Sequence, residues 1–111
     1  MKPKSVWWRR LLDTIGPRRK LRVVEGDCIP AKLPLRDLVV AREDGEDWCV
    51  GLRCPCGCGE RLEMVLLKGV KPRWDVILDD HGRVSLHPSV WLQTGCQSHF
   101  WIRKGKVVWC D

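Results

Sequence analysis

The sequence predicts a mostly β fold: a small antiparallel, zinc-ribbon-like β domain preceded by one short amphipathic helix. Three observations lead to this prediction. From residue 21 onward, short apolar runs alternate with turn residues, which is typical of strands joined by hairpins. Cysteines gather in two short turn-like segments, as they do in small domains held by a metal ion. Helical periodicity of the apolar residues is confined to the N-terminal segment.

Residues 1–22 are predicted to form a basic amphipathic arm, and residues 23–111 the β domain. Ser5 is a suitable helix N-cap, and Gly16 followed by Pro17 would end the helix. Between them the apolar residues recur at one-turn spacing; they are Trp7, Trp8, Leu11, Leu12 and Ile15. This apolar face either packs on the β domain or docks on a partner protein or an acidic surface; a membrane surface and nucleic acid are weaker alternatives.

In the β domain, strands are expected where β-prone runs lie between turn residues. The turn signals are Asp44-Gly45, residues 79–82 and Lys104-Gly105. The expected strands are 21–24, 38–42, 48–53, 61–67, 73–78, 83–86, 100–103 and 106–109. We expect the large and small apolar side chains in or near them to fill the core: Trp74, Trp91, Trp101 and Trp109, with the isolated Cys28, Cys49 and Cys110.

The net charge of +6 in 111 residues is concentrated in the arm. Residues 1–22 contain eight basic side chains and one acidic side chain, whereas the other 89 residues contain 12 basic and 13 acidic ones. This distribution argues against a domain that wraps nucleic acid, because such binding needs phosphate contacts spread over the folded surface. No segment approaches the roughly 18 apolar residues of a membrane span, and no signal peptide is recognisable. We therefore expect a cytoplasmic protein without membrane association, in which cysteines serve as metal ligands or reactive thiols.

The strongest chemical motif is the run Cys54-Pro55-Cys56-Gly57-Cys58-Gly59. Proline and glycine favour a tight turn on which several thiolates converge, although we expect one of the three sulfurs to face away from a shared ion. Cys96-Gln97-Ser98-His99 has the Cys-x-x-His spacing of a zinc knuckle and supplies a second half-site. A zinc site built from the two segments is the preferred interpretation. Reduced thiols without a metal and a redox pair are the alternatives.

A second candidate site involves serine and histidine. Ser85, His87 and Ser89 share one face of an extended segment, and Pro88 would place that segment at an edge or in a loop. Ser98 and His99 are neighbours, so in a strand they point to opposite faces and cannot pair with each other. His99 is either the fourth zinc ligand or a general base for a serine such as Ser89. These two roles exclude each other.

Three motifs in this order resemble a family of small bacterial proteins that was long defined only as a domain of unknown function. The motifs are residues 54–59, residues 86–90, and residues 95–102 continued by residues 104–109. The resemblance covers roughly residues 48–110. Members of that family are encoded beside bacterial ubiquitin-like proteins and their activating and conjugating enzymes, in operons linked to antiphage defence.

The resemblance implies a serine-type peptidase that processes a ubiquitin-like precursor or removes the ubiquitin-like protein from its targets. Carried over to this sequence, Ser89 would be the nucleophile, His99 the base, and Asp79 or Asp80 an orienting carboxylate, with Asp80 preferred. A structural zinc would then be held without His99, by Cys54, Cys56, Cys58 and Cys96. The partners implied are the ubiquitin-like protein and its activating or conjugating enzymes.

Two other functions remain open. The chain could be a noncatalytic zinc-ribbon module that binds a partner protein, with His99 completing the metal site and the arm as docking element. A metallopeptidase is a weaker alternative, because the sequence lacks the histidine-rich ligand set and a glutamate spaced as a general base.

Overall fold

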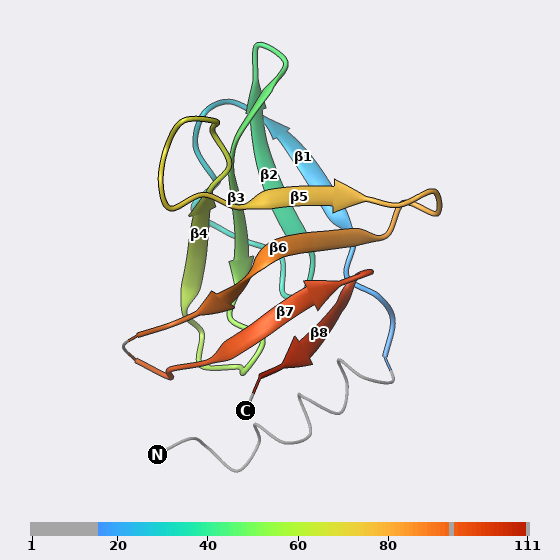
Figure 1. The fold of residues 1–111 in the computed structure, drawn as a ribbon, viewed down its shortest axis with the longest axis vertical. Helices are drawn as coiled ribbons and strands as arrows, with labels where there is room; N and C mark the ends of the chain where they lie inside the picture. Colours follow the sequence, from blue (N-terminus) through green and yellow to red (C-terminus); the bar gives the residue numbers. More distant parts are fainter. Residues whose placement is uncertain (1–15, 94, 111) are drawn as a thin grey trace.

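The computed structural model describes residues 16–93 and 95–110, which form two four-stranded β-sheets (Figure 1). The first sheet has the order β1 (Leu21–Glu25), β2 (Leu38–Glu43), β3 (Glu46–Arg53) and β4 (Arg61–Val65). The second has the order β5 (Asp75–Leu78), β6 (Val84–Trp91), β7 (His99–Arg103) and β8 (Lys106–Trp109). The described residues contain no helix, and the predicted N-terminal helix lies outside them.

The expectation of a mostly β, mostly antiparallel domain is confirmed. All neighbouring strands pair antiparallel except β1 and β2, which run parallel because residues 26–37 carry the chain back to the same end of the sheet. Each of the eight expected strands is present, but β6 is longer than expected and continues to Trp91. No described helix is long and apolar enough to cross a membrane.

The expectation that Pro88 lies at a sheet edge or in a loop is wrong, because β6 is an interior strand between β5 and β7. The physical reason is local. The pairing of β6 with β5 ends at His87, and its pairing with β7 shifts register between Leu86 and Val90. Pro88 therefore lies where neither ladder needs a backbone N–H, and a proline can be accommodated there.

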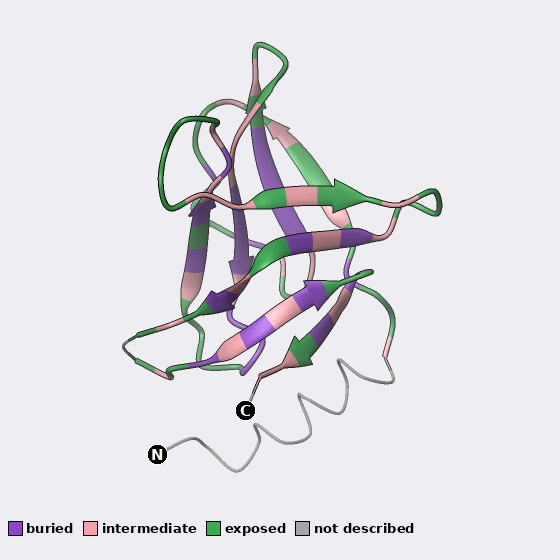
Figure 2. Cartoon of the chain, viewed as in Figure 1, coloured by how far each residue is buried: buried purple, intermediate pink, exposed green. Residues whose placement is uncertain are grey.

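The two sheets cross and bury their facing sides against one another (Figures 1 and 2). In β4 and β7, buried side chains alternate with more exposed ones, as the pleat requires for a sheet with one covered face, whereas β2 is buried on both faces. The first sheet contributes Leu38, Val40, Val50, Leu52, Leu62 and Met64, and the second contributes Val84, Leu86, Val90, Phe100, Ile102 and Val107. This single core fixes the position of one sheet on the other.

A smaller cluster covers the outer face of the first sheet. Ile29 and Leu33, from the loop between β1 and β2, pack there against Val39 and Ala41. Gly51 of β3 lies beneath Ile29, and a Cβ at this position would be only 2.7 Å from Ile29 Cγ2. A side chain at residue 51 would therefore displace the loop.

The segment before β1 is attached to the turn between β7 and β8. The backbone N–H of the buried Arg19 donates to the Gly105 carbonyl at 2.7 Å, and Arg18 donates through Nη1 to the Lys104 carbonyl at 2.7 Å. Gly105 has a positive φ of 78°, and a Cβ there would lie 2.7 Å from the Arg19 carbonyl oxygen. Glycine is therefore required at residue 105 for this close approach.

Candidate functional site: a cysteine cluster beside a serine–histidine pair

Four cysteines from different parts of the chain form one cluster. Cys54, Cys56 and Cys58 lie in the segment between β3 and β4, and Cys96 lies in the loop between β6 and β7. Their four sulfur atoms all lie within 4.8 Å of one another. The expectation that one sulfur of the first segment faces away is therefore wrong. Gly57, with a positive φ of 89°, lets the chain turn so that Cys58 rejoins the other two.

The sulfur positions fit a tetrahedral metal site. Cys54 Sγ lies 3.4 Å from Cys56 Sγ and 3.6 Å from Cys96 Sγ. Four sulfurs around one zinc ion at about 2.3 Å would be about 3.8 Å apart. His99 is not among the side chains that converge here. Among the described residues, the cluster is thus a four-cysteine set without an imidazole.

Ser98 supports the cluster from inside the protein. Its side chain is 1% exposed, and its Oγ lies 3.1 Å from Cys96 Sγ and 3.7 Å from Cys54 Sγ. Burial disfavours the charged form of Cys96, but hydrogen bonds from the Ser98 hydroxyl and backbone N–H, and from Cys54 and Cys56, lower its pKa to about 7. Burial raises the pKa of Cys54 and that of Cys58. A bound cation would supply the positive charge that four thiolates need.

On the opposite face of β7, Ser89 and His99 form a hydrogen-bonded pair. Ser89 Oγ lies 3.1 Å from His99 Nε2. The pairing irregularity in β6 produces this contact: Leu86 pairs with Ile102 and Val90 with Phe100, so β6 has two more residues than β7 over this stretch. Such bulges re-aim side chains. The Ser89 carbonyl also accepts a hydrogen bond from Trp74 Nε1 at 3.4 Å, which holds the bulge in place.

Trp91 is the residue of this site that the sequence interpretation missed. It pairs with His99 across β6 and β7, and its ring stacks on the imidazole with centroids 5.0 Å apart and an interplanar angle of 16°. Trp91 is 60% exposed, so the expectation that it belongs to the core is wrong. Trp74 and Trp109 do pack against the core, whereas Trp101 is half-buried on the outer side of β7 and is not part of the core. The alternation of Ser89 and Trp91 in one strand was the signal for a shared outer face.

Residues 25–110 match the family model of the bacterial ubiquitination-like system serine protease (BubE). The chain belongs to the BubE family. No curated protein and no solved structure matches the chain. The family assignment agrees with the expected link to ubiquitin-like conjugation, and its name describes a protease of a bacterial ubiquitination-like system.

A serine protease of the BubE family needs a nucleophilic serine, and the three serines that the structure describes differ in what they contact. Ser85 Oγ accepts a hydrogen bond from the backbone N–H of Lys104, and Ser98 faces the sulfur atoms. Ser89 alone among the three contacts a histidine ring nitrogen. The geometry therefore favours Ser89 as the candidate nucleophile.

Asp80 is not brought to the Ser89–His99 pair. It is exposed in the turn between β5 and β6, and Leu78 pairs with Val84, so this turn lies at the start of β6. Ser89 is five residues further along β6, roughly 15 Å at the rise of an extended strand. Asp79 instead accepts hydrogen bonds from the backbone N–H groups of Arg83 and His81, which lower its pKa. Within residues 16–93 and 95–110, no carboxylate forms a hydrogen bond with His99.

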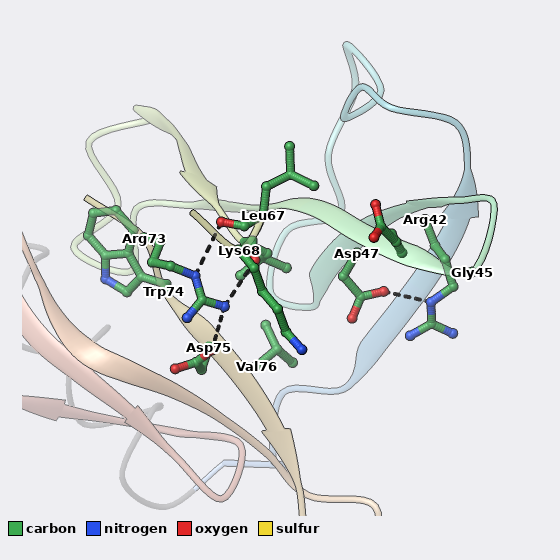
Figure 3. A pocket seen from close by; sticks show the side chains of 11 residues that line it. Arg42, Gly45, Asp47, Leu67, Lys68, Arg73, Trp74, Asp75 and Val76 are labelled. Atoms are coloured by element: carbon green, nitrogen blue, oxygen red, sulfur yellow. Dashed lines mark hydrogen bonds and ion pairs between the residues drawn. The ribbon is translucent and has the colours of Figure 1, made fainter. Parts of the chain in front are cut away.

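A cavity of about 620 Å³ is lined in part by Trp74, the tryptophan that donates a hydrogen bond to the Ser89 carbonyl (Figure 3). Its lining includes Trp74 and two ion pairs, Arg73–Asp75 at 2.8 Å and Arg42–Asp47 at 2.6 Å. No serine, cysteine or histidine lines it. The cavity can therefore bind a polar group but has no serine for a serine protease to use, and the candidate site is the open face with Ser89 and His99.

One of the isolated cysteines expected in the core is placed differently. Cys28 is exposed, so the expectation for it is wrong; it lies in the loop after β1, where its Sγ contacts the Asp27 carboxylate at 3.3 Å. Cys49 is half-buried and packs against the small cluster of Ile29 and its neighbours. All seven cysteines are free thiols in this structure.

Proposed function

We propose that this chain is a serine-type peptidase that processes or deconjugates a bacterial ubiquitin-like protein, with Ser89 as nucleophile and His99 as general base. The observation that carries the proposal is the 3.1 Å contact between Ser89 Oγ and His99 Nε2 on an open face of the second sheet. Family membership supplies the reaction class and the pathway. The partners would be the ubiquitin-like protein and its conjugating machinery, in an antiphage pathway of the bacterial cytoplasm.

The pair can perform acyl transfer with both protons accounted for. Ser89 Oγ bonds to the carbonyl carbon at the end of the ubiquitin-like tail while its proton moves to His99 Nε2. The bond from that carbon to the leaving nitrogen then breaks, and His99 returns the proton to this nitrogen. A water molecule hydrolyses the acyl ester by the same route. The Trp91 ring stacks on the imidazole of His99 and so keeps the imidazole in the same plane while it gains and loses the proton.

The four-cysteine cluster is proposed to hold a structural zinc ion. Cys54, Cys56, Cys58 and Cys96 supply the four ligands of a closed tetrahedral site, which leaves no coordination position for a reacting water. The ion would link the β3–β4 turn to the loop before β7 and so fix the position of His99. A noncatalytic module whose site is completed by His99 is less well supported, because His99 Nε2 is occupied by Ser89.

The test is cleavage of a bacterial ubiquitin-like precursor whose tail extends beyond the mature carboxyl end. Ser89→Ala is expected to lower the cleavage rate by about 10³-fold or more, because removal of a catalytic serine leaves only residual catalysis. Ser85→Ala is the matched control, since Ser85 also lies on β6 but contacts only a backbone N–H. A fluorophosphonate should label Ser89 in the wild type. Full cleavage by Ser89→Ala would rule out the serine mechanism.

A further inference from the structure

A row of three side chains runs along the outer face of β7, starting at the candidate active site. His99, Trp101 and Arg103 occupy alternate positions, while Phe100 and Ile102 between them are fully buried in the core. Successive residues of a strand point to opposite faces, so the three side chains share the solvent side of the sheet. The row leads from Ser89 and His99 toward the turn between β7 and β8.

Arg103 is held by an aromatic ring and not by a carboxylate. Its guanidinium carbon lies 4.5 Å from the centroid of the Trp101 ring, and in the described part of the chain it forms no ion pair. Four other arginines bond directly to carboxylates: the pairs are Arg22–Asp37, Arg42–Asp47, Arg61–Glu63 and Arg73–Asp75. A guanidinium that is stacked on an indole keeps its N–H edge available for an anion.

The surroundings of Arg103 concentrate positive charge. Arg103 lies opposite Lys106 across β7 and β8, so two basic residues are neighbours at this end of the sheet. Lys104 lies in the exposed turn between them, and Arg18 bonds to the Lys104 carbonyl. From Val84 to Cys110 the sequence contains no Asp or Glu. This end of the second sheet is therefore basic, and residues 84–110 supply no carboxylate to Arg103.

The spacing of the row matches that of an extended peptide. Arg103 is four residues from His99, about 13 Å at the rise of a strand, and an extended substrate advances by the same amount per residue. We propose that Arg103 and the β7–β8 turn bind an acidic side chain of the substrate, four residues from the bond that Ser89 attacks. The Trp101 ring lies under the peptide between the two points. This assignment of substrate class rests on the proposed function.

The experiment measures binding to the Ser89→Ala protein, so that it does not depend on cleavage. The probes are fluorescein-labelled peptides of Ala and Gly with an amidated carboxyl end. Each peptide contains one Glu, and its position moves by one residue from peptide to peptide, starting at the carboxyl end. A second set has Gln in place of Glu. Glu at the fourth position is expected to bind roughly tenfold tighter than Gln, since a hydrogen bond between two charged groups is stronger than one to a neutral amide. Arg103→Gln should abolish this preference. Arg22→Gln, at an exposed arginine of the first sheet, should leave it unchanged.

The outcomes separate this inference from the proposed function. If Arg103→Glu binds a peptide with Lys in place of Glu more tightly than the Arg103 protein does, residue 103 contacts the charged side chain of the peptide, which would confirm the inference. Equal binding of Glu and Gln peptides, or a preference that Arg103→Gln leaves intact, would overturn the inference even if Ser89 is the nucleophile. If the protein binds a labelled single-stranded oligonucleotide, loses this binding in Arg103→Gln and shows no preference among the peptides, the inference is overturned in favour of nucleic acid. Absence of cleavage by the wild type would instead count against the proposed function.

Discussion

Two neighbouring residues, Ser98 and His99, mark two regions of the molecule with different purposes. Ser98 is buried and points to the sulfur atoms of Cys54 and Cys96, whereas His99 points outward to Ser89. The sulfur cluster gathers ligands from a turn of the first sheet and a loop of the second. The Ser89–His99 pair belongs to the second sheet alone. In the proposed function, the residues that stabilise the fold and those that perform the chemistry therefore lie on opposite sides of the chain at the start of β7.

This division makes the two regions separable by mutation. A change in the cluster affects how the sheets are joined, so it should alter the fold and, through the start of β7, the position of His99. A side chain on the outer face makes few contacts with the core. Its substitution should therefore alter cleavage with little effect on metal binding.

The largest expected effect comes from breaking the metal centre. Cys56→Ser, or chelation of the wild type, should release the metal and unfold the domain, because binding of a structural zinc can supply about 10 kcal/mol or more of folding free energy. Circular dichroism and metal analysis measure the two losses together. Cys110→Ser is the control, since Cys110 lies outside the cluster. A variant that loses the metal and keeps its thermal transition would contradict a structural role.

A second prediction uses the pKa values of the cluster. Burial raises the pKa of Cys54 and that of Cys58, so without a metal both are thiols at neutral pH, whereas Cys96 with a pKa of about 7 is already partly ionised. Metal uptake must displace the protons of Cys54 and Cys58. The apparent affinity should therefore rise with pH, by roughly tenfold per displaced proton per pH unit. Competition with a chromophoric chelator at several pH values measures this slope, and an affinity independent of pH would contradict thiolate ligation.

Ser98→Ala sharpens the comparison, because it removes only the hydroxyl that faces the sulfurs. The expected result is a loss of about 10–100-fold in metal affinity, the usual effect of removing a group that supports metal ligands. Cleavage by the fully metal-loaded variant should remain close to that of the wild type. Ser85→Ala serves as the control for metal affinity. An unchanged affinity would show that the hydroxyl does not support the thiolates.

A smaller effect is expected from Trp91. Trp91→Ala should lower the cleavage rate by about two- to tenfold, because aromatic stacking contributes about 0.5–1.5 kcal/mol. Trp91→Phe should retain most of the rate, since a ring remains to stack on His99. Metal content and thermal stability should not change in either variant, because Trp91 is largely exposed. Equal rates for the wild type and Trp91→Ala would exclude a positioning role for the indole.

Much of the fold could be predicted because residues within each turn indicate where its hairpins lie. Asp44-Gly45 and Lys104-Gly105 occur at hairpins, and both glycines have a positive φ, which the turn chemistry demands. The crossing of two sheets could not be predicted in this way. It depends on contacts such as those of Leu52 and Phe100 in the shared core, which join residues far apart in the sequence.

The candidate site was predictable in part for the same reason. The family resemblance implies the pairing of Ser89 with His99. The geometry of this pair, however, depends on two extra residues in β6, and no local sequence pattern predicts them. The convergence of all four cysteines depends on how the β3–β4 turn meets the loop before β7. Asp80 as orienting carboxylate is implied only by the family resemblance, and strand register places it at the far end of β6 from Ser89.

The most direct test of the division between the two faces is His99→Ala, assayed for metal content and for cleavage in the same preparation. We predict that the variant keeps its metal and its fold while cleavage falls by about 10³-fold or more, as for loss of a catalytic base. His99 would then act on Ser89 and not on the metal. Release of the metal by His99→Ala, or cleavage at the rate of the wild type, would contradict the account.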